Sequence, residues 1–449
     1  MEIKYYRSAT IGLKFDNFKI LMDPWLTDGE YYGAWSHFPY FDIEKNLNEL
    51  NSYNAIYISH IHPDHCSEKT LKNISKNIPI YIHAYHKKFL KLKIESLGFK
   101  VIEVQNNKKI NIGPSVELNI IAADNCNPEL CYKHVGCAVL NDNKENSQQI
   151  DTVAVINDKK YCVVNTNDTP YELACETLDE IKKQYQNIDL LLTGYSGAGP
   201  YPQCFPQLTS EQKVIEGNKK KQFFLDQAFN FIKKINPNYY FLFAGTYNLS
   251  GKLWDLEKFK GVPSLEEANK YLKRRVINEK IKSSISLQLN TDCKFNLLDK
   301  KSSYPYKEIN KSEVFQYSKN ILSKKKLTYE RDEKIDIDEI YELSKKAHQK
   351  FLDFKLLTNS SFKTNIYIEI KDLLLKIPHN DENISLENNI DSSYDYLKLN
   401  LDERLFKDIL SGPRYAHWNN ADIGSHIQFS RNKNIYQRDV HYCLNFFHS

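Results

Sequence analysis

Residues 58–65 read Ile-Ser-His-Ile-His-Pro-Asp-His, and this stretch decides how the chain is interpreted. It overlaps a short apolar run, residues 54–59, which predicts a buried strand, and it precedes residues 67–78, where the spacing and a Ser-x-x-Thr start predict a helix. The pattern H-x-H-x-D-H therefore lies in a tight loop between a strand and a helix. Imidazole and carboxylate donors packed this densely suit zinc, iron or manganese.

The spacing within the motif predicts two neighbouring metal positions. His60 and His62 lie on one side of the turn, and Asp64 and His65 face a second position beside it. Two metal ions about 3.5–4 Å apart can hold a bridging water and make it a nucleophile near neutral pH. We therefore expect Asp64 and His65 to act in catalysis as well as in metal binding. A degenerate relic of a metal site is the alternative.

Length and composition exclude several classes of protein. With 449 residues the chain exceeds one ordinary domain of about 100–200 residues. Its 61 Lys+Arg and 57 Asp+Glu leave a net charge of +4, which does not favour nucleic-acid binding. No apolar run approaches the roughly 20 residues of a membrane span, and residues 1–7 show no signal-peptide core. The nine scattered cysteines are typical of reduced thiols, so we expect a cytoplasmic protein.

Predicted strands and helices alternate along the first part of the chain. The expected strands are residues 9–15, 18–22, 54–59, 78–83, 100–103, 116–122, 152–156, 161–165, 189–193 and 239–244, and the expected helices are residues 67–78, 89–97 and 211–235. This order predicts a layered α/β domain over residues 1–275. Residues 276–334 are expected to form a charged helical linker. Residues 335–449 are expected to form a smaller α+β domain, with helices near 337–354 and 402–411 and strands near 364–375 and 393–399.

The motif and its surroundings resemble the metallo-β-lactamase superfamily. Residues 23–26, Asp-Pro-Trp-Leu, match a D-P-W that many members carry after the second strand. Members also place an acid at the end of a later strand, and residues 163–169 make Asp168 the candidate bridging ligand. An Asx turn at the strand end is the alternative for Asp168. The resemblance implies an αββα sandwich, with two facing sheets, outer helices and a metal site at one edge.

More narrowly, the chain is similar to the metallo-β-lactamase-like part of the CMP-N-acetylneuraminate hydroxylases. The similarity lies in residues 58–71, 151–168, 194–205 and 235–247, and residues 421–436 resemble the tail of that family. That family also carries a Rieske iron–sulfur module with paired C-x-H and C-x-x-H ligands. These two motifs do not occur together in this sequence. Oxidative chemistry would therefore need electrons from a separate protein.

Hydrolytic members of the superfamily usually add two further histidine ligands, which this sequence does not show. The corresponding positions, residues 122–126 and 243–247, contain no histidine. Asp124 or His134 could take their place. A site with few histidines and one or two carboxylates favours non-haem iron, because two histidines and one carboxylate leave positions open for oxygen.

A loop of small residues and the C-terminal tail are further candidates for the site. Residues 194–200 read Gly-Tyr-Ser-Gly-Ala-Gly-Pro, and small side chains let a ligand approach the backbone. We therefore name Gly197, Gly199 and Tyr201 as substrate-contact candidates, with a plain turn as the alternative. Basic side chains of the tail could form a lid over the metal, or belong to the surface of a small domain: Arg414, His417, His426, His441 and His448.

Three functions fit these patterns. The first is a metal-dependent hydrolase in which activated water, oriented by Asp64, attacks a phosphoester, amide or lactone; one or two divalent ions, zinc first and iron or manganese next, are its expected cofactors. The second is a non-haem iron oxygenase that modifies a nucleotide-linked or amino sugar with a separate electron donor. The third is a non-catalytic, metal-stabilised binding protein. We expect a small-molecule substrate, neither nucleic acid nor membrane as a partner, and a homodimer through the aromatic C-terminal domain.

Overall fold

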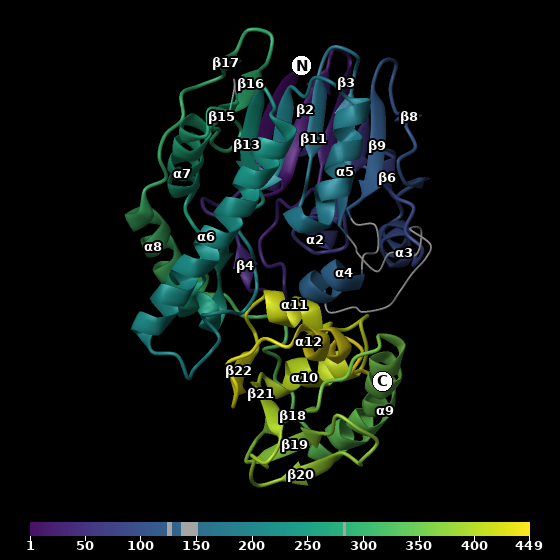
Figure 1. Ribbon diagram of the computed structural model, residues 1–449, viewed down its shortest axis with the longest axis vertical. Coiled ribbons are helices and arrows are strands. Elements are labelled where there is room, and N and C mark those ends of the chain that lie inside the picture. Colours follow the sequence, from purple (N-terminus) through teal and green to yellow (C-terminus); the bar gives the residue numbers. More distant parts are fainter. Residues whose placement is uncertain (124–127, 136–150, 282–283) are drawn as a thin grey trace.

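Two large sheets make up most of the molecule. The computed structural model describes residues 1–123, 128–135, 151–281 and 284–449. The first sheet contains β1 (Glu2–Arg7), β2 (Thr10–Phe15), β3 (Phe18–Met22), β5 (Ala55–Tyr57), β6 (Ile80–His83), β7 (Val101–Val104), β16 (Lys294–Asn296) and β17 (Lys301–Ser302). The second contains β8 (Ile110–Asn111), β9 (Glu117–Ala122), β10 (Thr152–Asn157), β11 (Cys162–Asn165), β12 (Leu190–Gly194), β13 (Tyr239–Phe243) and β15 (Ile285–Leu287). Their strand orders are β17-β16-β1-β2-β3-β5-β6-β7 and β15-β13-β12-β11-β10-β9-β8 (Figure 1).

Helices cover the outer face of each sheet. The first sheet is covered by α1 (Ile43–Leu50), α2 (Glu68–Asn73) and α3 (Phe89–Ser96). The second is covered by α5 (Tyr171–Gln184), α6 (Ser210–Ile235) and α7 (Leu265–Asn278). The layers are thus helix, sheet, sheet and helix, which confirms the predicted αββα class. Among the helices in the described part of the chain, none combines the length and the apolar character that crossing a bilayer requires.

Burial on both faces of the strands explains their apolar sequences. In β12, Leu190 and Leu192 belong to the core between the two sheets, whereas Leu191 packs against the helices that cover the second sheet. Successive side chains of a strand point to opposite faces, so a strand covered on both sides must be apolar throughout. This pattern therefore marks the central strands of the sandwich.

The carboxyl ends of the parallel strands meet at one edge of the sandwich. The pairs β3–β5, β5–β6 and β6–β7 are parallel, as are β11–β12, β12–β13 and β13–β15. Loops that follow such strands gather at the same edge of the sheets. Asp23 follows β3, residues 58–65 follow β5, and Asp168 follows β11.

The charged stretch after residue 275 contains strands, which differs from the expectation of a helical linker. β15 pairs with β13 of the second sheet, and β16 pairs with β1 of the first. Each short strand buries a single large apolar side chain, Leu287 in β15 and Phe295 in β16, too few to produce a visible alternation. Two helical segments follow, α8 (Lys311–Asn320) and the 3₁₀ helix η3 (Leu322–Lys324).

A second sheet-and-helix unit follows the sandwich. Its sheet has the order β20-β19-β18-β21-β22, formed by β18 (Thr364–Ile370), β19 (Leu373–Ile377), β20 (Ser385–Glu387), β21 (Asp395–Asn400) and β22 (Gln428–Arg431). Its helices are α9 (Ile337–Leu357), α10 (Glu403–Leu410), α11 (Trp418–Ile423) and α12 (Arg438–Leu444). The single strand expected over residues 364–375 is a hairpin, because Lys371 takes a left-handed turn conformation with φ 53°.

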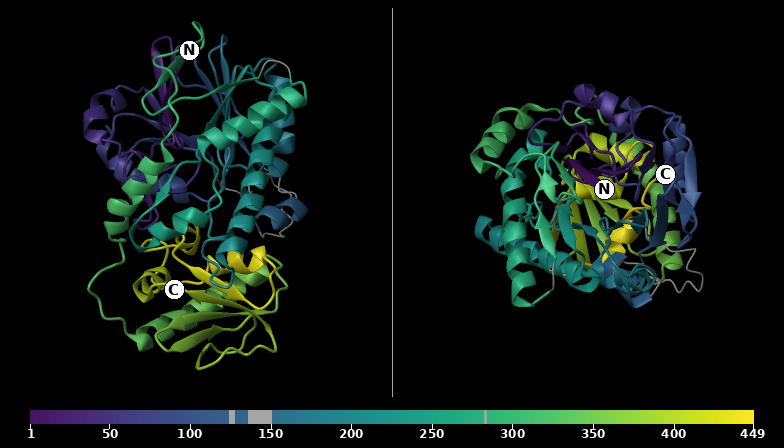
Figure 2. Two further views of the ribbon diagram at one scale, coloured as in Figure 1. Left: turned by 90° about the vertical axis from the view of Figure 1, so that its left-hand side faces the viewer. Right: turned by 90° about the horizontal axis from the view of Figure 1, so that it is seen from above.

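The second unit shares a core with the metal-loop edge of the sandwich. Figures 1 and 2 show its sheet beyond one end of the sandwich, with α11 at the junction. One apolar cluster joins Trp25, Tyr31 and Tyr247 of the sandwich side to Trp418 and Phe429 of the second unit. Smaller elements complete the described chain: α4 (Pro128–Val135), the two-stranded ribbon of β4 (Trp35–Ser36) and β14 (Asn248–Leu249), and the 3₁₀ helix η2 (Gly251–Phe259).

Truncation of Phe241 tests the core between the sheets. Phe241 is fully buried in β13 and packs edge-on against Tyr5 of β1, with ring centroids 5.1 Å apart. Phe241→Ala is expected to lower the free energy of unfolding by about 3–5 kcal/mol, because it removes buried apolar surface and leaves a cavity. Phe223→Ala, at a side chain of α6 that is 54% exposed, is the control and should change it by less than about 0.5 kcal/mol. Equal urea midpoints for the two variants would contradict this account of the core.

Candidate metal centre

The loop after β5 presents its histidines because the chain turns sharply into α2. The backbone N–H groups of His65 and Cys66 both donate to the carbonyl of His62, at 3.0 and 2.8 Å. Ser67 then caps α2, and its side chain accepts a hydrogen bond from the backbone N–H of Thr70. The helix start predicted from the Ser-x-x-Thr pattern is therefore confirmed, and the turn before it holds the motif in a compact form.

His60, His65 and Asp168 form the tightest group of donors. One ligand-type atom from each lies within 4.8 Å of the others. The His65 Nε2 atom is 3.3 Å from Asp168 Oδ2, and the rings of His60 and His65 are 4.2 Å apart. Both histidines are fully buried, and His60 Nε2 has no hydrogen-bond partner among the residues that the structure describes. Two buried imidazoles and a carboxylate this close together fit a divalent metal ion.

Asp64 and His62 lie directly beside this group. Asp64 Oδ2 is 3.7 Å from His65 Nε2, and its Oδ1 accepts a hydrogen bond from the Tyr31 hydroxyl. The His62 ring is 4.8 Å from the His60 ring and nearly perpendicular to it, at 87°. The spacing paired His60 with His62 and Asp64 with His65. In the structure, His65 Nε2 lies nearer to Asp168 Oδ2, at 3.3 Å, than to Asp64 Oδ2, at 3.7 Å.

Asp168 reaches the centre because its neighbour makes the local turn. Asn165 at the end of β11 accepts the backbone N–H of Asn167 at 3.0 Å, and Asn167 has a left-handed backbone with φ 46°. The Asx-type turn considered for Asp168 is thus formed by the side chain of Asn165. The Asp168 side chain, 41% exposed, instead faces His65 at the open side of the centre.

Asp23 is the supporting residue whose role the sequence did not assign. Its Oδ1 accepts the backbone N–H of Ser59 at 2.7 Å, and its Oδ2 accepts the Ser59 hydroxyl at 2.8 Å. The same Oδ2 is 2.9 Å from His65 Nδ1, and Asp23 is fully buried. Asp23 therefore orients His65 with its Nε2 atom towards the centre. The D-P-W stretch contains Asp23, but in the sequence it indicated only a family resemblance and not a supporting role.

Asp151 is a second carboxylate near the centre that the sequence did not single out. Its Oδ1 atom is 4.0 Å from His60 Nδ1.

Burial and nearby charges shift the pKa values of His60 and His65 in opposite directions. Burial lowers the pKa of His60, and the neighbouring histidines lower it further. Burial acts the same way on His65, but Asp168, Asp64 and Asp23 outweigh it and hold the pKa of His65 well above its ordinary value. Burial raises the pKa of Asp64. The carboxylates around His65 thus create a position that favours positive charge, which is what a metal cation requires.

The other predicted site residues contact different parts of the protein. Asp124 lies outside the described residues. His134, on α4, pairs with Glu172, with 3.1 Å between its Nε2 and Glu172 Oε2. The loop with Gly197, Gly199 and Tyr201 packs on α6: the Tyr201 hydroxyl donates to Glu216 at 2.8 Å, and a Cβ on Gly197 would lie 1.9 Å from the ring of Phe224. These contacts fix the loop against α6. The role of the loop in binding a substrate stays a prediction.

Two histidines of the tail reach the surroundings of the metal loop. His426 Nε2 is 2.8 Å from the backbone oxygen of Tyr31, and its Nδ1 is 2.9 Å from the Tyr329 hydroxyl. The backbone N–H of His417 donates to the Tyr32 hydroxyl at 2.7 Å. Asn419 of α11, which the sequence did not single out, contacts the motif itself, with 2.8 Å between its Oδ1 and His62 Nε2. The C-terminal unit therefore borders the centre.

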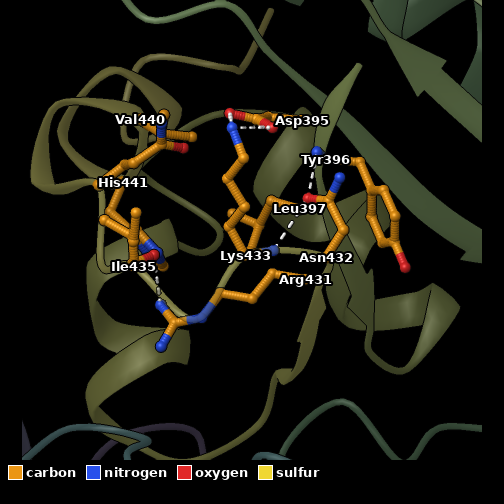
Figure 3. A pocket seen from close by; sticks show the side chains of 10 residues that line it. Asp395, Tyr396, Leu397, Arg431, Asn432, Lys433, Ile435, Val440 and His441 are labelled. Atoms are coloured by element: carbon orange, nitrogen blue, oxygen red, sulfur yellow. Dashed lines mark hydrogen bonds and ion pairs between the residues drawn. The ribbon is translucent and has the colours of Figure 1, made fainter. Parts of the chain in front are cut away.

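A separate pocket lies in the C-terminal unit, between β21, β22 and α12 (Figure 3). Its charged groups are already paired: Lys433 Nζ lies 2.8 Å from Asp395 Oδ1, and Arg431 donates to the backbone oxygen of Ile435 at 2.8 Å. His441 of the tail lines this pocket. The ammonium group of Lys433 and one terminal nitrogen of Arg431 are thus used within the fold, whereas Arg431 Nε has no hydrogen-bond partner among the described residues.

Comparisons with known proteins agree with the fold and the motif. Residues 2–185, which include the metal loop and Asp168, match the model of the beta-lactamase superfamily domain. The cytidine monophosphate-N-acetylneuraminic acid hydroxylase of Xenopus laevis is 27% identical over 260 residues, which are 55% of this chain and 38% of that protein. A Mycolicibacterium smegmatis protein, whose name proposes it as a Rieske 2Fe-2S iron–sulfur protein, is 25% identical over 55% of this chain and 44% of its own.

Among solved structures, one titled a possible metal-dependent hydrolase from Veillonella parvula shares 13% identity over 66% of this chain and 99% of its own, with a TM-score of 0.46. The chain spans about two fifths of the length of the two sequence relatives. The matched part of the chain contains the H-x-H-x-D-H loop and Asp168. Residues 2–185 are thus similar to the beta-lactamase superfamily domain.

Proposed function

We propose that this chain is a metal-dependent enzyme whose centre holds iron and oxidises a small substrate. The observation that carries the proposal is the donor set of His60, His65 and Asp168, two imidazoles and one carboxylate within 4.8 Å. Iron held by two histidines and one carboxylate keeps coordination positions open for oxygen and substrate. This choice departs from the hydrolase that the sequence favoured, because the tightest donor group has the composition of an iron site.

The residues around the donors have separate tasks in this proposal. Asp23 orients His65, and Tyr31 orients Asp64 through its hydroxyl. Asp64 is buried, and burial raises its pKa, so its carboxyl group can exchange a proton with a bound substrate closer to neutral pH than an ordinary aspartate can. Asp168 lies at the exposed side of the centre, which we take as the side from which substrate enters.

The sequence relatives support a sugar-like substrate and an external source of electrons. Relatives named cytidine monophosphate-N-acetylneuraminic acid hydroxylase match more than half of this chain. We therefore propose a nucleotide-linked or amino sugar as the substrate class. The paired ligand motifs of a Rieske module do not occur in the printed sequence, so the electrons would come from an iron–sulfur donor outside it.

Hydrolysis is the second candidate, and the number of nearby donors favours it. Asp64 and His62 lie beside the group of three, so the loop offers more donors than one metal ion needs. A pair of zinc ions in such a site would polarise a substrate and acidify water. In this case Asp64 would orient the attacking water.

Elemental analysis of the purified protein distinguishes the two candidates. Protein prepared without added metal is expected to contain about one iron per chain, since two histidines and a carboxylate provide one such site. His65→Ala should reduce the metal content at least about tenfold, because it removes a ligand. His86→Ala, at an exposed histidine, is the control and should retain the metal. About two zinc ions per chain would favour hydrolysis, and wild-type protein without metal would reject both enzyme proposals.

Proton release on metal binding tests the charge of the centre. The pKa of His65 is raised well above its ordinary value, so metal-free protein carries a proton on His65 at pH 7, and that proton must leave before Nε2 can bind a metal. We expect roughly one proton released per metal ion at pH 7. The number should fall as the pH rises through the raised pKa of His65. Titration calorimetry in buffers of different ionisation enthalpy measures it, and identical heats in all buffers would contradict the assignment.

A further inference from the structure

We propose that Asn419, on α11 of the C-terminal unit, is a positioning residue of the metal centre. Its side-chain oxygen accepts the Nε2–H of His62 and thereby leaves His62 Nδ1 unprotonated and available as a donor to a metal ion. The two atoms are 2.8 Å apart and come from residues 357 positions apart in the chain. This inference rests on the metal centre of the proposed function and adds His62, which lies beside the group of three, to its donors.

The first argument is that each histidine of the centre has one nitrogen held by a neighbour. His60 Nδ1 is 2.9 Å from the Ser59 hydroxyl, and His65 Nδ1 is 2.9 Å from Asp23 Oδ2. A metal-binding histidine uses one nitrogen for the metal and donates the other N–H to an acceptor, which fixes the tautomer. Asn419 completes this pattern for His62. Here the neighbour holds Nε2, whereas in His60 and His65 the neighbour holds Nδ1.

The second argument is that Asn419 is held in place by its own surroundings. The His417 side chain caps α11 and accepts the backbone N–H of Asn419 at 3.2 Å. The indole N–H of Trp418, a buried side chain, donates to the carbonyl of Phe447 at 2.8 Å. An acceptor that is fixed before the metal arrives loses little conformational entropy when the site forms.

A second contact from the same segment reaches the other side of the loop. His426 lies 2.8 Å from the carbonyl of Tyr31, and the Tyr31 hydroxyl donates to Asp64. Residues 417–426 therefore contact His62 directly and also contact Tyr31, which donates a hydrogen bond to Asp64. The C-terminal unit would thus contribute to the geometry of the centre.

Three variants of the full chain test this role. Asn419→Leu removes the acceptor, whereas Asn419→Asp keeps an oxygen in its place, and a carboxylate is a common partner of a metal-bound histidine. Asn400→Ala is the matched control, because it removes an asparagine hydrogen bond to Glu369, of 3.0 Å, elsewhere in the same unit. Circular dichroism and urea unfolding check that each variant folds.

Two measurements are made on each variant. Long-range ¹H–¹⁵N spectra of histidine-labelled, metal-free protein report the tautomer of His62, whose signals are assigned by their loss in His62→Gln. Competition with a chelator measures the affinity for Zn²⁺ and for Fe²⁺ under anaerobic conditions. We expect the Nε2–H tautomer in the wild type and a 10–100-fold loss of affinity in Asn419→Leu, at about the size known for such supporting partners. Asn419→Asp and Asn400→Ala should stay within about threefold of the wild type.

The outcomes separate this inference from the proposed function. An Nδ1–H tautomer in the wild type would overturn it, since that proton would block the metal; so would a wild-type tautomer and affinity in Asn419→Leu. If Asn419→Leu does not fold, the wild-type tautomer and the Asn419→Asp affinity still decide the question. A wild type that binds neither ion would remove the proposed function, and with it the role of Asn419 towards a metal.

Discussion

The buried carboxylate of Asp23 is the interaction on which the arrangement of the metal loop depends. It connects the end of β3 to the loop after β5 through the backbone and hydroxyl of Ser59, and it holds the Nδ1 edge of the His65 ring. Asp23 adopts a left-handed backbone conformation, with φ 43°, that few residues other than asparagine and aspartate take readily. A fully buried carboxylate is stable only when its oxygens accept hydrogen bonds, so the same contacts that orient the loop also make Asp23 tolerable there.

The class of fold and the metal loop could be predicted because their signals are local. Residues 58–65 contain four donors in a short span, and strands covered on both faces, such as β12, are apolar throughout. The expectation of a helical linker over residues 276–334 was wrong because β15 and β16 are short and each buries one large apolar side chain, so they show no alternating pattern. Their place in the sheets depends on partner strands far away in the chain. Lys371 divided an expected strand into a hairpin because its left-handed conformation is not visible in the apolar pattern.

The residues that support the site were not predicted, for a different reason. Asp23 and Asn419 act through hydrogen bonds to residues that are distant in sequence, and neither belongs to a dense motif of its own. Asn419 in particular is one of many asparagines in the chain, and only the packing of α11 against the sandwich distinguishes it. The shared apolar cluster of Trp25, Tyr31 and Phe429 provides that packing. The position of Asn419 beside the centre therefore depends on the core that the two units share.

The pairing of β1 with β16 has a consequence for how the chain is made. Glu2 lies opposite Asn296, so this strand from the beginning of the sequence has no partner on one side until nearly three hundred residues have followed. During synthesis the edge of β1 would stay open for most of the time that the sandwich needs to emerge, and an open edge can pair with strands of other chains. Contacts this far apart also slow folding, because a long loop must close first. The late arrival of β16 therefore closes an edge of β1 that the strands between them leave unpaired.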